Sequence, residues 1–320
     1  MTPRRAPTFT ARMALCALAL ACTAAPRPAA QQPASSPRAA APRKKVLVVG
    51  IDGVRIDVLR SLHLPTIEML AANGVLTEAR ARMPTVSGPG WSSILIGVWS
   101  DKHGVKNNEF VGKNYAAYPD FLTRLERLDP KWSTFAALDW PPLGSALGGG
   151  PLVGDSVDVK VLVNGDRVGY PEADARAATA AARYLANEDP DAAFVYLGNP
   201  DEVAHAVGPL TPEYRAALQE ADRLVARLIS AIRSRPTYAR EDWLILMSTD
   251  HGHVDKGGHG GASAVELTSF FLASGPSVAR APVATPVDIV DVAVTALAHL
   301  GVAIDPAWGL DGKVVGLRRP

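Results

Sequence analysis

The sequence predicts an α/β domain in which helices cover both faces of a mostly parallel central sheet. Three observations point to this fold class. Continuous apolar runs recur along the chain, as expected of strands that are buried on both faces. Segments with helical periodicity separate these runs. Aspartates and histidines follow directly after three of the runs, and an open α/β sheet binds its ligands beyond the carboxyl ends of its strands.

The first 43 residues have the composition of an export leader. They contain six arginines and no acidic residue, whereas the rest of the chain has 27 Lys and Arg against 32 Asp and Glu, a net charge of −5. Three of the arginines precede an apolar segment, 13–25, that is too short to span a bilayer. We therefore predict a signal peptide over 1–25, a disordered Pro/Ala-rich linker over 26–43 and a folded catalytic domain over 44–320.

Such a leader predicts a periplasmic or secreted protein. The run 19–22 loosely resembles a lipoprotein cleavage site, so lipid attachment at Cys22 is an alternative, as is an uncleaved N-terminal anchor. Cys16 and Cys22 are the only cysteines, too few for a disulfide scaffold or a structural cysteine-based zinc site. Because the folded part is acidic, we expect no stable complex with nucleic acid. We also expect no membrane span.

Five strands and six helices are predicted along the folded part. The apolar runs that predict strands are 45–51, 133–138, 192–197, 243–248 and 269–273. Helical periodicity is found at 64–73, 91–98, 118–127, 171–187, 212–234 and 287–300. Thr211 followed by Pro212 is typical of a helix start. The glycine-rich segment 143–154 predicts a loop near the mouth of a site. This alternation favours one domain with no internal repeat.

Potential metal ligands follow the first, third and fourth apolar runs. They are Asp52 after the first run, Asp201 and His205 after the third, and Asp250, His251, His253 and His259 after the fourth. Each group alone is a weak signal, because an aspartate at a strand end is often a helix cap. Together, at successive strand ends, they predict a metal site. Carboxylates and imidazoles without cysteine suit zinc, with manganese or iron as alternatives.

Ser87 lies in a segment, 83–94, that reads as a loop entering a helix. A helix N-terminus favours an anion through its free N–H groups and its dipole. A hydroxyl beside a divalent metal can lose its proton and become a nucleophile. The alternative interpretation of Ser87 is a simple helix cap.

These segments resemble the alkaline phosphatase superfamily, and most closely its nucleotide pyrophosphatase/phosphodiesterase branch, over residues 46–276. The residues that match the motifs of that branch are Asp52, the segment 84–90 with Ser87 in the nucleophile position, His103 with Gly104, Asn108, Pro200 with Asp201, His205, Gly208 and Pro209, Asp250 with His251 and Gly252, and His259.

The resemblance implies a three-layer α/β/α sandwich and an exported hydrolase that cleaves phosphodiester or pyrophosphate bonds in a small phosphoester substrate. It implies two divalent ions, zinc by preference. The implied ligands are Asp201, His205 and His259 for one ion, and Asp52, Asp250 and His251 for the other. It also implies that Ser87 attacks phosphorus to form a phosphoseryl intermediate and that the Asn108 amide contacts the phosphate.

The chain departs from that branch in three places. Ser87 replaces the usual threonine, Gly88 and Gly90 replace a phenylalanine and an asparagine, and only seven residues separate His251 from His259 where the branch carries a long insertion. These departures leave nucleotide specificity open.

Several alternatives follow. His253 could replace His259 as a ligand, while His103, Asp255 and Glu266 are expected to be structural or surface groups. A phosphomonoesterase remains an alternative on the same site, although no arginine clamp is evident. A sulfatase is disfavoured because Trp91 stands where its motif has arginine. A phosphomutase is disfavoured by export, and an inactive binding module by the complete set of ligands.

Overall fold

The computed structural model describes residues 1–3, 6–8, 10, 41–283 and 286–318. The chain divides into two units, Met1–Ala40 and Ala41–Pro320. Most of the predicted signal peptide and linker, including Cys22, lies outside the described residues, so these predictions stay as they are. The second unit holds the fold. Its first strand begins at Arg43, the last residue of the predicted linker.

One eight-stranded sheet forms the centre of the second unit, in the order β4-β3-β5-β1-β6-β7-β2-β8. All neighbouring strands pair in parallel except β7, which is antiparallel to both β6 and β2. The strands are β1 (Arg43–Ile51), β2 (Gly74–Arg80), β3 (Thr134–Leu138), β4 (Val159–Leu162), β5 (Ala192–Leu197), β6 (Glu241–Ser248), β7 (Thr268–Ser274) and β8 (Val287–Asp288). The mostly parallel sheet is therefore confirmed.

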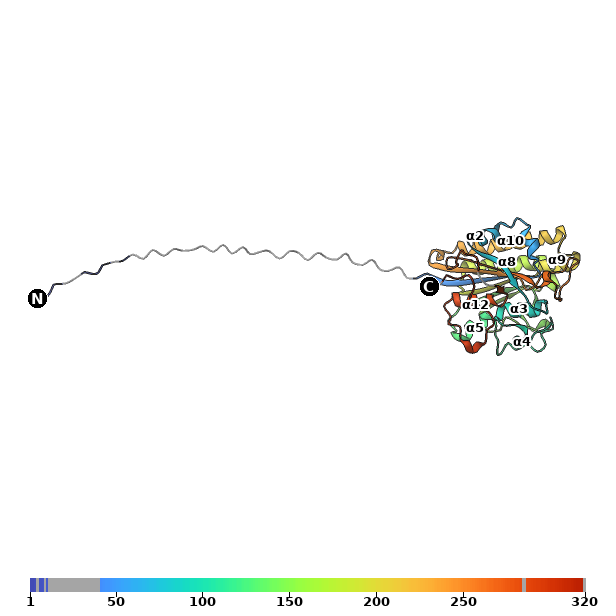
Figure 1. The fold of residues 1–320 in the computed structure, drawn as a ribbon, viewed down its shortest axis with the longest axis horizontal. Coiled ribbons are helices and arrows are strands. Elements are labelled where there is room, and N and C mark those ends of the chain that lie inside the picture. Colours follow the sequence, from blue (N-terminus) through green and yellow to red (C-terminus); the bar gives the residue numbers. More distant parts are fainter. Residues whose placement is uncertain (4–5, 9, 11–40, 284–285, 319–320) are drawn as a thin grey trace. The chain divides into compact units, whose positions relative to one another are not determined.

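Helices cover both faces of this sheet, so the unit has three layers (Figure 1). The helices are α1 (Ile56–Arg60), α2 (Pro65–Ala72), α3 (Ser87–Ile96), α4 (Ser100–His103), α5 (Phe121–Leu128), α6 (Pro141–Gly144), α7 (Gly165–Val168), α8 (Tyr170–Asn187), α9 (Asn199–Val207), α10 (Pro212–Arg233), α11 (Ala264–Leu267) and α12 (Asp291–His299). Helices α2, α8 and α10 pack on one face, and α3, α5 and α12 on the other.

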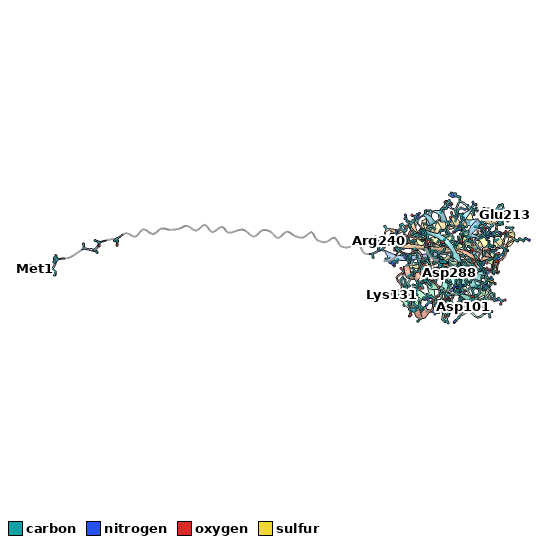
Figure 2. All side chains as sticks on the ribbon, viewed as in Figure 1. Met1, Asp101, Lys131, Glu213, Arg240 and Asp288 are labelled. Carbon is teal, nitrogen blue, oxygen red and sulfur yellow. The ribbon has the colours of Figure 1, made fainter. Side chains whose placement is uncertain are left out.

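Two hydrophobic cores, one on each face, explain the continuous apolar runs. In β1, Val46 and Val48 pack into the core beneath α3 and α12, whereas Leu47 and Val49 pack into the core beneath α8 and α10. Successive side chains of a strand point to opposite faces, so a central strand must be apolar at every position. Charged groups such as Asp101, Lys131, Glu213 and Arg240 are left on the outer surface (Figure 2).

The structure contains every predicted strand and helix, but it also contains three strands that the sequence did not reveal. β4 is only half-buried, β8 has two residues, and β2 has just two buried positions in its seven, so none of them has a continuous apolar run. The helix predicted over 287–300 was wrong in its first turn, because β8 occupies that stretch and α12 begins at Asp291.

Helix starts follow ordinary capping chemistry. The Thr211 side chain accepts a hydrogen bond from the Tyr214 N–H, as the sequence predicted. Helix α3 begins at Ser87, four residues before the predicted start. Its first turn contains Pro89, which is tolerated there because the first N–H groups of a helix have no partner within the helix.

Among the described residues, none of the helices combines the length and apolarity needed to cross a bilayer.

Candidate active site

The predicted site residues converge at the carboxyl ends of the three central strands, β5, β1 and β6. Asp52 follows β1, Asp201 lies in the first turn of α9 after β5, and Asp250 lies two residues after β6. These strands are adjacent and parallel, so their ends meet at one edge of the sheet. All three aspartates are buried.

One cluster of ligand atoms belongs to Asp52, Asp250 and His251, whose candidate donor atoms all lie within 4.8 Å of one another. His251 Nε2 is 3.1 Å from Asp250 Oδ2 and 3.7 Å from Asp52 Oδ1. Both of these carboxylate oxygens are buried without a hydrogen-bond partner among the described residues. Asp52 Oδ2, by contrast, accepts hydrogen bonds from Trp91 Nε1 at 2.8 Å and from the Tyr196 hydroxyl. Two unpartnered anionic oxygens facing one imidazole fit a divalent cation.

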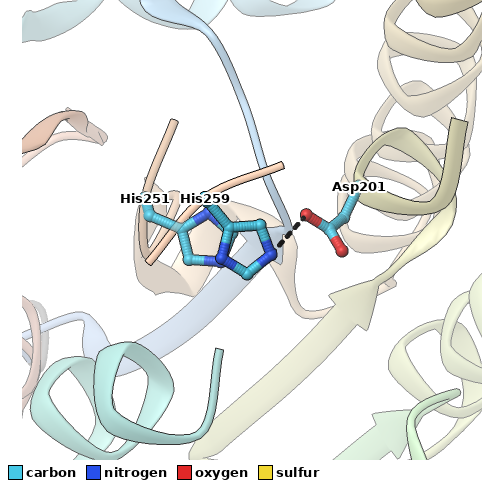
Figure 3. A group of neighbouring side chains, drawn as sticks. All are labelled: Asp201, His251 and His259. Atoms are coloured by element: carbon cyan, nitrogen blue, oxygen red, sulfur yellow. Dashed lines mark ion pairs between the residues drawn. The ribbon is translucent and has the colours of Figure 1, made fainter. Parts of the chain in front are cut away.

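A second cluster lies beside the first and consists of Asp201, His251 and His259 (Figure 3). The rings of His251 and His259 stack with their centroids 3.7 Å apart. His259 Nε2 is 3.7 Å from Asp201 Oδ1. His205 joins this cluster, because its Nε2 is 2.9 Å from His259 Nε2 and 3.3 Å from Asp201 Oδ2. The structure therefore brings together all six predicted ligands.

The hydrogen bonds of His251 and His259 decide which ring nitrogen is free. His251 Nδ1 is 3.2 Å from the Gly252 carbonyl oxygen, and His259 Nδ1 is 2.8 Å from the Thr85 carbonyl oxygen. A carbonyl oxygen only accepts, so in each histidine Nδ1 carries the proton. Each Nε2 is then unprotonated and has a lone pair that can bind a metal ion.

The alternative ligand, His253, is placed differently. It is fully buried and does not line the cavity, whereas His259 does. His253 Nε2 lies 2.7 Å from Asp201 Oδ1.

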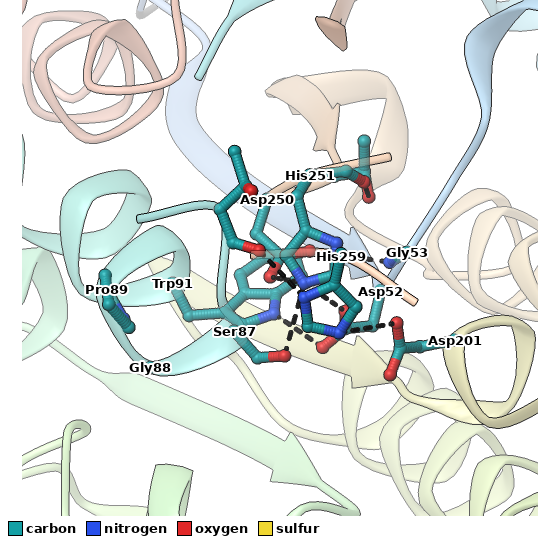
Figure 4. A network of polar contacts seen from close by, with 12 residues as sticks. Asp52, Gly53, Ser87, Gly88, Pro89, Trp91, Asp201, Asp250, His251 and His259 are labelled. Carbon is teal, nitrogen blue, oxygen red and sulfur yellow. Dashed lines mark hydrogen bonds and ion pairs between the residues drawn. The ribbon is translucent and has the colours of Figure 1, made fainter. Parts of the chain in front are cut away.

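Ser87 is the first residue of α3 and faces the metal clusters (Figure 4). Its hydroxyl oxygen is 3.4 Å from His251 Nε2. The cap position of α3 is Val86, and no side chain caps this helix, so the interpretation of Ser87 as a cap is not supported. The hydroxyl therefore lies at a helix N-terminus, where an anion is favoured.

The glycines that flank Ser87 allow close approaches. The Gly88 N–H donates to Asn108 Oδ1 at 2.7 Å. A Cβ on Gly88 would lie 2.7 Å from the Asn107 carbonyl oxygen, and one on Gly90 would lie 2.6 Å from Asp250 Cβ. The two departures from the family motif thus let α3 rest against Asn108 and a predicted metal ligand.

A cavity of about 120 Å³ opens onto this arrangement. Its lining residues are Asp52, Ser87, Asn108, Trp140, Tyr170, Tyr196, Gly198, Asp201, Glu202, His205 and His259. The sequence analysis did not name five of these as site residues: Trp140, Tyr170, Tyr196, Gly198 and Glu202. Glu202 could have been found as the neighbour of Asp201, but Trp140 and Tyr170 have no local signal. Within the part of the chain that the structure describes, no lysine or arginine lines the cavity.

The remaining groups singled out in the sequence have structural contacts. His103 is fully buried and bonds to Ser93 Oγ at 3.1 Å. Glu266 forms a capping box with Ser263 at the start of α11. Asp255 forms an ion pair with Arg55.

Burial, reinforced by repulsion between carboxylates, dominates the electrostatics of the site. Burial, together with the charge of Asp201, raises the pKa of Asp52 to about 7. Burial and the charge of Asp52 raise the pKa of Asp250 well above its ordinary value. Burial works in the same direction at Asp201, but hydrogen bonds from His205 and His253 hold its pKa below the ordinary value. Three buried carboxylates with so few cationic partners fit a site that binds divalent cations.

We expect Asp52 to make the metal-free protein less stable as the pH rises from about 4 to about 7, whereas His251 and His259, whose pKa values are lowered by burial, act in the opposite direction. In this window the folded state keeps a proton on Asp52, whose pKa is about 7, while the unfolded chain has already lost it near 3.8. Protonation therefore favours folding at the lower pH, and this advantage, on the order of 4 kcal/mol, disappears as the pH rises through 7.

Urea unfolding in the presence of a chelator, at several pH values, measures this dependence. Asp52→Asn should flatten the curve, because asparagine does not titrate. An Asp52→Asn variant whose stability changes between pH 5 and pH 7 by the same amount as that of wild type would contradict the expectation.

Comparison with known proteins shows a family match over most of the folded part of the chain. Residues 46–275 match the model of a family described as type I phosphodiesterase / nucleotide pyrophosphatase. Human ectonucleotide pyrophosphatase/phosphodiesterase family member 7 is 27% identical over 228 residues, which cover 66% of this chain and 49% of that protein. Human bis(5'-adenosyl)-triphosphatase is 24% identical over 228 residues, which cover 65% of this chain and 47% of that protein. The chain thus spans about half the length of these curated relatives.

Solved structures share the fold. Murine ectonucleotide pyrophosphatase/phosphodiesterase 5, as an inactive form in complex with AMP, matches with a TM-score of 0.63 at 16% identity, over 81% of this chain and 96% of that chain. A 2-O GAG sulfatase matches with a TM-score of 0.64 at 15% identity, over 86% of this chain and 73% of that chain. These likenesses establish the alkaline phosphatase-like α/β fold.

Proposed function

The chain belongs to the type I phosphodiesterase/nucleotide pyrophosphatase family, and on that basis we propose that it is an exported hydrolase of phosphodiester or pyrophosphate bonds. The observation that carries the proposal is the convergence of three buried aspartates and three histidines beside Ser87 at one helix N-terminus. We propose that hydrolysis uses two divalent ions and a covalent phosphoseryl intermediate.

The donor set fits two zinc ions. We assign Asp201, His205 and His259 to one ion, and Asp52, Asp250 and His251 to the other. The unpartnered oxygens of Asp52 and Asp250 and the free Nε2 atoms of His251 and His259 support this assignment. Bound dications would supply positive charge to the attacking and leaving oxygens of an in-line displacement.

The chain's own residues supply the nucleophile and position the phosphate. Ser87 Oγ forms a bond to phosphorus as the bond from phosphorus to the leaving group breaks; the Ser87 hydroxyl proton passes to solvent, and the leaving alcohol or phosphate takes up a proton. Water then hydrolyses the resulting phosphoseryl ester, which releases the product and returns a proton to Ser87. The N-terminus of α3 favours the phosphate anion. Asn108 holds its carbonyl oxygen on the Gly88 N–H, so its amide hydrogens are available to a non-bridging phosphate oxygen.

The charges around the cavity favour a diester over a monoester. A diester carries one negative charge, whereas a monoester carries nearly two. The lining contains Glu202 but no lysine or arginine that would bind the extra charge. We therefore expect a higher kcat/KM for bis-p-nitrophenyl phosphate than for p-nitrophenyl phosphate.

Glu202→Gln tests the electrostatic part of this expectation. Removing the carboxylate should lower the ratio of kcat/KM for the diester to kcat/KM for the monoester by about two- to fivefold. The effect is small because an exposed charge contributes little to the binding of another charge. Glu213→Gln, on the outer surface, serves as the matched control and should leave the ratio unchanged. Higher turnover of the monoester than of the diester by the unaltered protein would overturn the diesterase assignment and favour the phosphomonoesterase.

Sulfatase activity is the second candidate to be tested, because a sulfatase is among the structural neighbours. Trp91 stands where the sulfatase motif has arginine, and its indole N–H is committed to Asp52. We therefore expect no turnover of p-nitrophenyl sulfate in the same assay. A completely inactive protein in all three assays would favour the binding module.

We propose a small phosphoester as the substrate and a periplasmic or secreted location. The AMP in the murine neighbour and the names of the curated ectoenzymes support these proposals. The signal peptide, the linker and the alternative of lipid attachment at Cys22 remain predictions from the sequence.

A further inference from the structure

A fourth histidine, His253, lies directly behind the candidate metal clusters. Its side chain is fully buried. It comes two residues after His251 and packs edge-on against both His205 and His259, with ring centroids 5.1 Å away from each. Position alone would therefore allow it to bind a metal ion, but its hydrogen bonds do not.

Both nitrogens of His253 are already engaged. The backbone N–H of Gly258 lies 3.2 Å from Nδ1, and since an N–H group can only donate, Nδ1 must be the acceptor. The ring proton of the neutral imidazole is then on Nε2, which lies 2.7 Å from Asp201 Oδ1 and donates to it. This is the reverse of His251 and His259, which carry the proton on Nδ1.

The neighbouring backbone holds this pair in place. Gly53 has a φ of +64°, and a Cβ there would lie 2.6 Å from His253 Nε2 and 2.5 Å from Asp201 Oδ1. The Arg55 guanidinium donates to the His253 carbonyl oxygen at 2.9 Å. The loop after β1 therefore packs against both partners of the hydrogen bond and leaves little room for either side chain to move.

We propose that His253 is a positioning residue that fixes the carboxylate of Asp201 for metal binding and does not itself bind the ion. By donating to Oδ1, it holds the carboxylate between two predicted ligands, with Oδ1 3.7 Å from His259 Nε2 and Oδ2 3.3 Å from His205 Nε2. This inference rests on the proposed two-metal function. Groups that orient a metal ligand typically change metal affinity ~10–100-fold when they are removed.

Two amide substitutions separate the two hydrogen bonds of His253. In His253→Gln the amide nitrogen reaches the place of Nε2 and can still donate to Asp201. In His253→Asn the amide lies near the place of Nδ1, where its oxygen can accept from Gly258, but no donor reaches Asp201. Both variants thus carry a side-chain amide, and they differ in whether that amide can donate a hydrogen bond to Asp201.

Zinc affinity, measured by competition with a chromophoric chelator, and the absorption spectrum of the cobalt-substituted protein give readouts that do not depend on turnover. We expect wild type to bind two ions, His253→Asn to bind one of them ~10–100-fold more weakly, and His253→Gln to stay within a few-fold of wild type with an unchanged cobalt spectrum. Thermal unfolding of the metal-free proteins checks that both variants fold.

The outcomes separate the two proposals. If His253→Asn binds both ions as tightly as wild type does, the positioning role is wrong while the two-metal function stands. If both variants lose the ion equally and the cobalt spectrum changes, His253 is a ligand and the inference is overturned. If wild type itself binds no metal ion, the proposed function fails.

Discussion

Ser87→Ala should reduce turnover of a phosphodiester by ~10⁴-fold or more, because it removes the only atom that we assign to bond formation with phosphorus. The Ser87 oxygen lies at the first residue of α3, 3.4 Å from His251 Nε2. Alanine suits a helix start and removes no capping bond, so the fold and metal binding should be unaffected. Steady-state kinetics with bis-p-nitrophenyl phosphate, beside a zinc titration, measure both effects.

Ser93→Ala provides the matched control for this variant. Ser93 is buried on the same helix, and its hydroxyl bonds to the Pro89 carbonyl oxygen and to His103, outside the cavity. We expect its turnover to stay near that of wild type. Mass spectrometry of wild type quenched during turnover of bis-p-nitrophenyl phosphate should detect a p-nitrophenyl phosphate adduct on the peptide that contains Ser87. Undiminished turnover by Ser87→Ala would rule out the phosphoserine mechanism.

Asp250→Asn should have opposite effects on activity and on the stability of the metal-free protein. The substitution removes a charged ligand, so we expect one ion fewer and a loss of turnover of ~10³-fold or more, since the charge of a metal ion is worth several kcal/mol in the transition state. Burial and Asp52 raise the pKa of Asp250, which shows that its charge is unfavourable without a cation. Removing that charge should therefore raise the Tm of the metal-free protein.

If the Tm of metal-free Asp250→Asn rises while its turnover falls, the loss of turnover is not caused by unfolding. A variant that lost turnover by unfolding would have a lower Tm as well. Asp101→Asn, on the surface of α4, makes the same chemical change where no ligand is involved and should alter neither quantity (Figure 2). Treatment of wild type with a chelator should reproduce the loss of turnover, and added zinc should restore it. Full turnover by Asp250→Asn would remove Asp250 from the metal site.

The sequence predicted the parts of the fold in which burial is complete. β1 is apolar at every position from Val46 to Val49, because helices cover both of its faces, and this made it visible. β4 at the sheet edge is half-buried and alternates in polarity, so it was missed. The start of α3 was missed because Gly88 and Pro89 disfavour a helix interior, although a first turn tolerates them.

The candidate ligands could be found from the sequence because each follows a strand that could itself be recognised. The roles of the four clustered histidines could not, because they depend on which backbone group meets each Nδ1. The Thr85 carbonyl faces His259, whereas the Gly258 N–H faces His253, and neither contact is visible in the order of residues. Trp140 and Tyr170 reach the cavity only through the folding of distant segments.

The contact between Gly90 and Asp250 links the nucleophile to the metal site. A Cβ at position 90 would lie 2.6 Å from Asp250 Cβ, so the backbone of α3 rests directly on the residue assigned as a ligand. This contact between two segments that are remote in sequence therefore limits how far α3 can move relative to the predicted metal ligands. During divergence, position 90 could gain a side chain only together with a compensating shift of the turn after β6, so these two segments are expected to evolve as a pair.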